Sequence, residues 1–271
     1  MCPKLRKAAC SNKRNGTCHV QSVVQTSFMT RKRSAGSLRE IKFQIDVAPY
    51  AVSSVLVSFG NTQVICATTV EHGVPKWIKE QGIVGGWITA EYSMLPYSTT
   101  MRKPRDSIRG RQDGRGVEIQ RLIGRALRAA VNREILGSRT LWVDCDVLQA
   151  DGGTRAAAIT GSWVAVYIAI RRLFREESPD TSPTSCKVAA VSLGIVDGKA
   201  LLDLDYEEDK RAEVDLNLVM TDTFDIVDLQ ASGEKSVLGT VQLDLLLKMG
   251  RRGIQKILEL QQEALIHAGY G

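Results

Sequence analysis

LWVDCDVLQADGGTRAAAITG, residues 141–161, is the stretch of this chain that decides its fold. Its first eight residues, 141–148, are apolar except for Asp144 and Asp146, a pattern that predicts a mostly buried strand. The turn DGGT follows at residues 151–154, and the apolar segment 156–170 has the length of a helix. The stretch therefore predicts a buried strand, a glycine turn and a helix in direct succession.

The glycine turn is a candidate anion site. Two successive glycines permit positive φ angles and let a ligand approach the backbone amides closely. The unpaired N–H groups and the positive dipole end of the following helix attract anions. Arg155 opposes this dipole, and a bound phosphate would account for its charge. The alternative is an ordinary turn in which Thr154 caps the helix and Arg155 is solvated, and the local pattern does not decide between the two.

The composition indicates a globular protein with a basic N-terminal extension. In 271 residues with 44% hydrophobic content, one sizeable core or two small cores with a shared interface can form. No apolar run reaches membrane-spanning length, which predicts a soluble protein with no membrane partner. Residues 1–39 carry nine Lys and Arg and no acid, so 27 basic against 30 acidic residues leave the body at −3. Any polyanion must therefore be bound by local basic patches.

The cysteines indicate a reducing compartment. Cys66, Cys145 and Cys186 lie in apolar, strand-like segments and are expected to be small buried hydrophobic residues, which favours a cytoplasmic location. The other three lie in the extension, 1–36, and their spacing matches no zinc module. We expect this extension to be disordered. A transit peptide, or translation that starts at Met29, remains an alternative.

Periodicity divides the body into two halves. Alternating apolar residues predict strands at 39–48, 52–59, 62–70, 87–92, 188–196, 199–206, 214–220 and 224–229. Helical spacing predicts helices at 117–136, 156–170, 240–249 and 253–267. A linker rich in Ser, Pro and Thr at 178–185 separates residues 37–178 from residues 186–268. We expect the two halves to pack as one globule.

Two charged segments are further candidates for function. The connection 97–116 carries six basic residues against two acids, and it is either an electrostatic guide for an RNA backbone or a solvated loop. Seven carboxylates lie between residues 203 and 215. They are either the oxygen ligands of a divalent cation such as Mg²⁺ or a solvated hairpin turn. The alternation around Asp203 and Asp205 predicts a strand with one exposed face.

Residues 142–155, WVDCDVLQADGGTR, resemble the phosphate-binding signature of the ribonuclease PH family, phosphorolytic 3′ exoribonucleases that trim transfer RNA precursors. The resemblance extends from about residue 38 to about residue 264. It is also strong in SSVLVSFGNTQVICAT, GGWITAEYSMLP, EIQRLIGRALRAAV and DYEEDKRAEVD. One departure is Tyr97, which follows Leu-Pro where the family usually has Arg.

The resemblance implies a fold and an assembly. The fold would be α/β (α+β) of the ribosomal protein S5 domain 2-like type, with mixed sheets packed with helices. The assembly would be a homo-oligomeric ring, a hexamer built as a trimer of dimers.

The resemblance also implies a set of site residues. The phosphate-binding residues would be Arg115, Gly153, Thr154 and Arg155. The residues that line the RNA entrance would be Arg102, Arg105, Arg109 and Arg111. Asp209 and Asp215 would be catalytic and would hold Mg²⁺.

The reaction implied is attack of inorganic phosphate on the 3′-terminal phosphodiester of RNA, with release of a nucleoside diphosphate. Such a nucleophile is already anionic, so the protein needs only to bind it, align it and stabilise charge. The three histidines lie in no triad setting, which this chemistry does not require. The alternative is a non-catalytic RNA-binding ring subunit of an exosome-like complex. The intact GGTR turn and the Asp209–Asp215 pair favour the enzyme.

Overall fold

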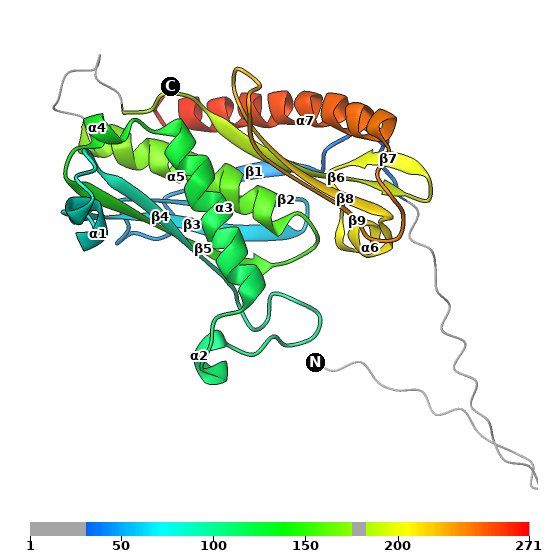
Figure 1. Ribbon diagram of the computed structural model, residues 1–271, viewed down its shortest axis with the longest axis horizontal. Coiled ribbons are helices and arrows are strands. Elements are labelled where there is room, and N and C mark those ends of the chain that lie inside the picture. The colour runs from blue at the N-terminus through cyan, green and yellow to red at the C-terminus, as the bar shows by residue number, and fades with distance from the viewer. Residues whose placement is uncertain (1–30, 175–182, 271) are drawn as a thin grey trace, which may run out of the picture. The chain divides into compact units, whose positions relative to one another are not determined.

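Two β-sheets carry the fold of the computed structural model, which describes residues 31–174 and 183–270 (Figure 1). The first sheet has the order β1-β2-β3-β5-β4, and its strands are β1 (Ile41–Ile45), β2 (Ser53–Phe59), β3 (Thr62–His72), β4 (Trp87–Met94) and β5 (Arg139–Gln149). The second has the order β7-β6-β8-β9, and its strands are β6 (Val188–Val196), β7 (Lys199–Leu202), β8 (Val214–Thr221) and β9 (Ile226–Gly233). Only β4 and β5 pair in parallel among these strands. The expected mixed α/β architecture is confirmed.

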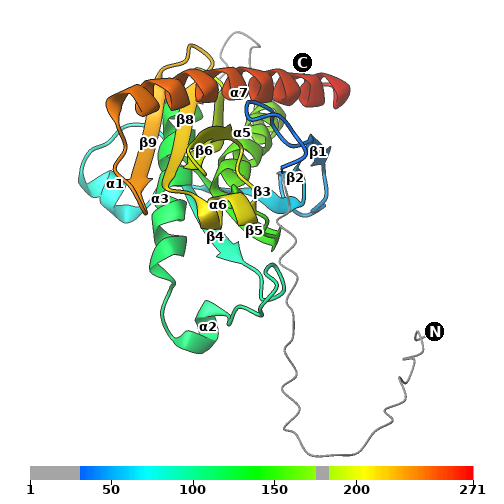
Figure 2. The same ribbon diagram turned by 90° about the vertical axis from the view of Figure 1, so that its right-hand side faces the viewer.

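Helices fill the space between and around the sheets. The long ones are α3 (Gly114–Ala130), α5 (Thr154–Leu173) and α7 (Thr240–His267), and the short ones are α1 (Lys76–Glu80), α2 (Asp106–Arg109), α4 (Arg133–Leu136) and α6 (Tyr206–Arg211). Helix α5 packs against β2 and β3 of the first sheet and β6 of the second, and α7 lies across β6 and β7 (Figures 1 and 2). Residues from Arg33 onward form one compact unit.

Helix α5 is the centre of the core. By length and composition it is the one helix of the described chain that could cross a membrane, contrary to our expectation that no such segment exists. However, 78% of its apolar window is buried inside the protein. Because both sheets cover it, its hydrophobic surface is explained by packing, as in the core helix of a soluble protein.

The C-terminal helix corrects one prediction. The sequence predicts two helices, 240–249 and 253–267, with a break between them, but α7 runs without interruption. A Cβ atom at Gly250 would lie 2.6 Å from the Leu218 side chain, and one at Gly253 would lie 2.9 Å from the Leu202 side chain. These glycines therefore permit close packing of the helix on the sheet, and do not end it.

Other boundaries also differ from the predictions. The helix expected at 117–136 is divided into α3 and α4, because Val131 is extended and Asn132 accepts hydrogen bonds from the first amides of α4. The strand expected at 199–206 ends at Leu202, and the chain then turns into α6. The connection 97–116 contains α2 and the start of α3.

Parts of the remaining predictions lie outside the described residues. These are the extension up to residue 30, with its three cysteines, and residues 178–182 of the linker. Residues 33–36, which we expected to be disordered, are ordered, because Arg33 forms ion pairs with Asp203 and Glu208 at 3.2 and 3.1 Å. Cys66 and Cys145 are buried as free thiols, as predicted, whereas Cys186 is only partly buried and precedes β6.

Candidate active site

The turn after β5 has the backbone that the sequence predicts. Gly152 and Gly153 have φ angles of 74° and 67°, in the left-handed region that favours glycine. Thr154 does not cap α5, because Gly153 is the N-cap and no described side chain caps this end. The Thr154 hydroxyl instead accepts a hydrogen bond of 2.8 Å from the Tyr92 hydroxyl. The first N–H groups of α5 therefore lack partners within the helix and are available to an anion.

Contacts from two segments hold this turn in place. The Thr62 hydroxyl donates to the Gly152 carbonyl at 2.6 Å and accepts from the Asp151 amide at 3.0 Å. The Asp151 carboxylate accepts from the Asn61 side chain at 3.1 Å and from the Tyr206 amide, at the start of α6, at 3.4 Å. Asp151 is thus occupied in structural hydrogen bonds, and the turn is preorganised.

A cavity of about 360 Å³ lies at this turn. Residues 152–154 line it together with Arg115 from α3, Asp209 and Tyr206 from α6, and Met101. Tyr206 and Met101 are exposed by 52% and 84%. The cavity therefore combines backbone amides, a cation and a carboxylate with exposed apolar surface.

Two arginines and two carboxylates interact electrostatically here, and of these Arg115 and Asp209 line the cavity. Burial raises the pKa of Asp209, while Arg115 and Arg155 oppose the increase. Burial and, after it, the neighbouring Asp209 carboxylate raise the pKa of Asp215 to about 6. The structure thus brings together residues from α3, α5, α6 and β8 that are up to 100 positions apart (residues 115 and 215).

Two polar residues that the sequence did not identify complete this arrangement. The Asn217 amide donates to both carboxylate oxygens of Asp215, at 3.3 and 3.2 Å. The Arg155 guanidinium donates to the Gln230 side chain at 2.7 Å. Asn217 and Gln230 are register partners in β8 and β9, so their side chains lie on the same face of the sheet. The only sequence signal was the spacing of Asp215 and Asn217, which places both on one face of a strand.

The acidic segment does not form one cluster. Asp203 is buried, with a φ of 58°, and pairs with arginines. Asp205 caps α6 by accepting from the Glu208 amide at 2.9 Å, and Glu213 accepts from the Gly198 amide at 3.2 Å. The exposed strand face expected around Asp203 and Asp205 is therefore wrong, because hydrogen bonds and buried ion pairs take up these carboxylates.

Asp209, which lines the cavity, and Asp215, whose pKa it raises, remain as an interacting pair of carboxylates. The described residues contain no group of three or more His, Cys, Asp or Glu side chains arranged to hold a metal ion. Mg²⁺ sites commonly use one or two carboxylates and complete the shell with water and substrate phosphates. After burial, the Asp209 carboxylate is the next cause of the raised pKa of Asp215, and a divalent cation would offset the combined charge of the two carboxylates, so the pair fits Mg²⁺ that arrives with a phosphate substrate.

The basic connection extends away from both sheets as a segment that includes α2 (Figures 1 and 2). Lys103 forms an ion pair of 2.9 Å with Asp113 inside this segment, and the Asp106 carboxylate accepts from the Asp113 amide at 3.1 Å. The predicted RNA-binding arginines of the segment are Arg102, Arg105 and Arg111, which are exposed, and Arg109, which is the last residue of α2. The three exposed arginines do not line the cavity at the turn.

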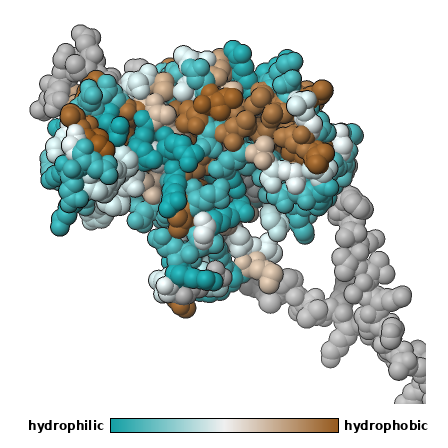
Figure 3. Space-filling model, in the orientation of Figure 1, coloured by the Kyte–Doolittle hydropathy of each residue, from teal (hydrophilic) through white to brown (hydrophobic). Residues whose placement is uncertain are grey.

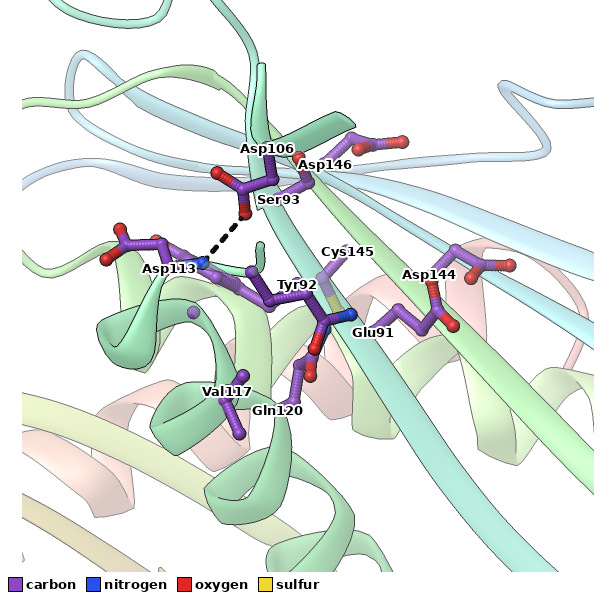
Figure 4. A pocket seen from close by; sticks show the side chains of 12 residues that line it. Glu91, Tyr92, Ser93, Asp106, Asp113, Val117, Gln120, Asp144, Cys145 and Asp146 are labelled. Carbon is purple, nitrogen blue, oxygen red and sulfur yellow. Dashed lines mark hydrogen bonds between the residues drawn. The ribbon is translucent and has the colours of Figure 1, made fainter. Parts of the chain in front are cut away.

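A second pocket, of about 290 Å³, lies beside β4 and β5 (Figure 4). Five of its twelve lining residues are carboxylates, and those on the strands are Glu91, Asp144 and Asp146. Burial and then Glu91 and Asp146 raise the pKa of Asp144. Such a wall repels phosphate, so this pocket is not the anion site.

Comparisons with known proteins identify the family. Models of the 3′ exoribonuclease family match residues 37–171 (domain 1) and 186–255 (domain 2). A protein of Rhodococcus erythropolis described as ribonuclease PH is 48% identical over 234 residues, which cover 86% of this chain and 89% of that protein. One of Maricaulis maris, described in the same way, is 47% identical over 233 residues, which cover 86% of this chain and 97% of that protein.

Solved structures with this fold are more distant. An Archaeoglobus fulgidus exosome with RNA bound to the active site matches with a TM-score of 0.71 at 22% identity, over 84% of this chain and 90% of that chain. Rice Rrp46 matches with a TM-score of 0.70 at 16% identity, over 86% of this chain and 98% of that chain. At these identities the similarity establishes the fold alone.

Proposed function

The chain belongs to the 3′ exoribonuclease family, and from this membership and the cavity at the GGTR turn we infer that it is a phosphorolytic 3′-to-5′ exoribonuclease of the ribonuclease PH type. It shortens RNA, including transfer RNA precursors, from the 3′ end. One observation carries the assignment of the site: the helix-terminal amides, Arg115, Arg155 and the Asp209–Asp215 pair lie together. A ring subunit without catalytic function needs none of these groups.

Inorganic phosphate binds at the turn in this proposal. The Gly153 and Thr154 amides and the two arginines neutralise its charge and orient one oxygen toward the terminal phosphodiester. That oxygen forms a new bond to phosphorus, and the bond from phosphorus to the 3′ oxygen of the preceding nucleotide breaks. The leaving 3′ oxygen takes up a proton. The products are RNA shorter by one nucleotide and a nucleoside diphosphate.

Asp209 and Asp215 organise the other side of the reacting phosphate. Asn217 holds the Asp215 carboxylate through both oxygens, so its orientation is fixed before substrate binds. Mg²⁺ held by this pair would offset the negative charge that accumulates on the phosphate oxygens. Tyr206 and Met101 offer their exposed apolar surface to the terminal nucleobase, because stacking on an aromatic ring accepts every base.

The basic segment guides RNA toward the cavity. Arg102, Arg105 and Arg111 are exposed and form no ion pair among the described residues, so they suit contacts with successive phosphates, and Arg109 belongs to the same segment. Because the segment extends from the sheets, these arginines lie along the path of the RNA and outside the reacting site.

We propose that the assembly is a homohexameric ring, a trimer of dimers, in the cytoplasm. Figure 3 shows apolar side chains gathered on the face that carries β9 and the start of α7. The exposed ones include Ile226 and Leu229 on the edge strand β9 and Val241 and Leu245 on α7. An edge strand with such neighbours favours burial against another subunit. Sedimentation of the purified protein tests the hexamer, and a monomer at micromolar concentration would contradict it.

The activity is tested with purified protein, Mg²⁺ and an RNA with a single-stranded 3′ end, with and without inorganic phosphate. Nucleoside diphosphates that appear only with phosphate are the expected result. Monophosphates formed without phosphate would identify a hydrolytic nuclease and contradict the role of the turn. Bound RNA without any product would favour the scaffold subunit.

A further inference from the structure

A buried arginine joins the two halves of the candidate site. Arg39 lies just before β1, far from the site in sequence, and its side chain is 8% exposed. The Asp203 carboxylate accepts from the Arg39 guanidinium at 2.7 Å (Nη2) and 3.0 Å (Nε), and from the Arg39 backbone amide at 2.7 Å. Both oxygens of a buried carboxylate therefore bind this single residue.

The same guanidinium also holds the phosphate-binding turn. Its Nη1 donates to the Asp151 carbonyl, and its Nη2 lies 3.3 Å from the Gly152 carbonyl. In a planar trans peptide the carbonyl and the following N–H point in opposite directions. When the Gly152 carbonyl points to Arg39, the Gly153 N–H points to the other side. Arg39 thus acts together with the Thr62 hydroxyl, which donates to the same carbonyl at 2.6 Å, to set the direction of the amide that is to meet the phosphate.

Asp203 connects this arginine to the helix that carries the catalytic carboxylate. Its amide donates to the Ser192 carbonyl at 2.6 Å, and it lies two residues before Asp205, the cap of α6. The turn also presses on this segment, because a Cβ atom at Gly152 would lie 2.5 Å from the Leu204 carbonyl oxygen. The spacing between the turn and Asp209 therefore depends on the contact between Arg39 and Asp203.

A contribution to stability does not by itself explain why Arg39 and Asp203 are buried as an ion pair. Taking an arginine and an aspartate out of water is costly, and the attraction between them often only balances that loss. What a bidentate buried pair provides is a fixed geometry. Here that geometry relates two segments, 151–154 and 203–209, that must bind one phosphate between them.

We propose that Arg39 and Asp203 are positioning residues that hold the phosphate-binding turn at a fixed distance from the Asp209–Asp215 pair. Neither residue contacts the reacting atoms. The inference rests on the proposed phosphorolytic function. It goes beyond that function because two residues outside the site, Arg39 and Asp203, would control the affinity of the enzyme for inorganic phosphate.

The test compares Arg39→Lys with Arg172→Lys. Lysine keeps the charge and loses the planar set of donors. Arg172 is a control of the same kind, because its guanidinium contacts the Val52 carbonyl, the Asp46 carboxylate and the Tyr270 hydroxyl, none of which belongs to the site. We measure KM for phosphate, kcat, RNA affinity and the increase in Tm that phosphate produces over KCl of equal ionic strength.

Arg39→Lys is expected to raise KM for phosphate about tenfold or more and to reduce the phosphate-dependent increase in Tm, because a displacement of about 1 Å at a reacting group costs up to about a hundredfold. RNA affinity should stay within about twofold of the wild type, and Arg172→Lys should keep the wild-type KM. An unchanged KM in Arg39→Lys would overturn the inference, even if Tm falls, because a purely structural role lowers stability without changing phosphate affinity.

A second variant covers the case in which Arg39→Lys does not fold. The double variant Arg39→Met/Asp203→Asn removes both charges of the pair, so neither is left buried without the other, and Arg33, which also pairs with Asp203, keeps its ion pair of 3.1 Å with Glu208. It is expected to fold and to show the same increase in KM, and a wild-type KM would overturn the inference. Failure of the wild type to need phosphate would overturn the proposed function itself. A phosphate-dependent wild type with unchanged variants would overturn only the positioning role.

Discussion

Gly152→Ala tests whether the phosphate-binding turn is pressed against the segment that leads into α6. Gly152 has a φ of 74°, where an L residue costs about 1 kcal/mol or more. The added Cβ would also lie 2.5 Å from the Leu204 carbonyl oxygen and 2.6 Å from the Asp205 carbonyl carbon. Both are backbone atoms, so the turn and the segment must separate.

The magnitude follows from these two contributions. Forcing a methyl group into packed structure costs about 1–3 kcal/mol, which with the backbone contribution gives about 2–4 kcal/mol in total. In a protein of this size that lowers Tm by roughly 10 °C. Because the separation displaces the Gly153 amide from Asp209, KM for phosphate should rise by about ten- to a hundredfold.

Gly198→Ala is the matched control. Gly198 has a φ of 71° in the turn between β6 and β7, and no atom lies within 4 Å of the position that a Cβ would take, so the variant carries only the backbone cost of about 1 kcal/mol. Thermal unfolding and initial rates of diphosphate release across a phosphate titration are measured for both variants. Equal Tm and equal KM for the two would refute the close contact between the turn and the segment before α6.

Three further predictions concern the site. In EDTA at pH 8, the free energy of unfolding of Asp215→Asn should exceed that of the wild type by up to about 3 kcal/mol, and the variant should lose phosphorolysis. The pKa of Asp215 is about 6 in the folded protein and 3.8 in the unfolded chain, so the wild type loses stability as pH rises from about 4 through 6. The difference in free energy of unfolding between variant and wild type should therefore vanish near pH 3. An equal difference at pH 3 and pH 8, measured by calorimetry, would contradict the burial of this carboxylate. Arg155→Ala should abolish phosphate-dependent trimming while RNA binding in a filter assay stays intact, and equal activity would rule out its phosphate contact. Replacing Arg102, Arg105 and Arg111 with Ala should weaken RNA binding and flatten its salt dependence by about 0.7 per lost contact, with KM for phosphate unchanged; an unaltered salt slope would exclude them from the RNA path.

The strands and long helices could be predicted because their signals are local. Alternating apolar residues locate β2 and β3, and helical spacing locates α3 and α5, since one buried face imposes one period. The errors arose where tertiary packing overrides the local signal. Gly250 and Gly253 suggest a helix end, but they lie within α7 because the sheet approaches the helix at these positions.

The candidate site was also predictable in part. The GGTR turn is a motif that can be recognised in one dimension, and Arg115, Asp209 and Asp215 followed from the family resemblance. Asn217 and Gln230 carry no such signal, because an isolated polar residue in a strand is common. Their roles depend on the pairing of β8 with β9, which positions them against Asp215 and Arg155.

The sequence by itself determined the order of the strands, the long helix after the glycine turn, the glycine backbone of that turn and the residue types that phosphate chemistry needs. Local sterics and hydrophobic period are properties of a short segment, so a single sequence is sufficient for them. Only the tertiary structure decided which of the seven carboxylates face the cavity and which are used for ion pairs and caps. It alone also placed Arg39 between the turn and Asp203, because contacts between distant segments depend on how the whole chain packs.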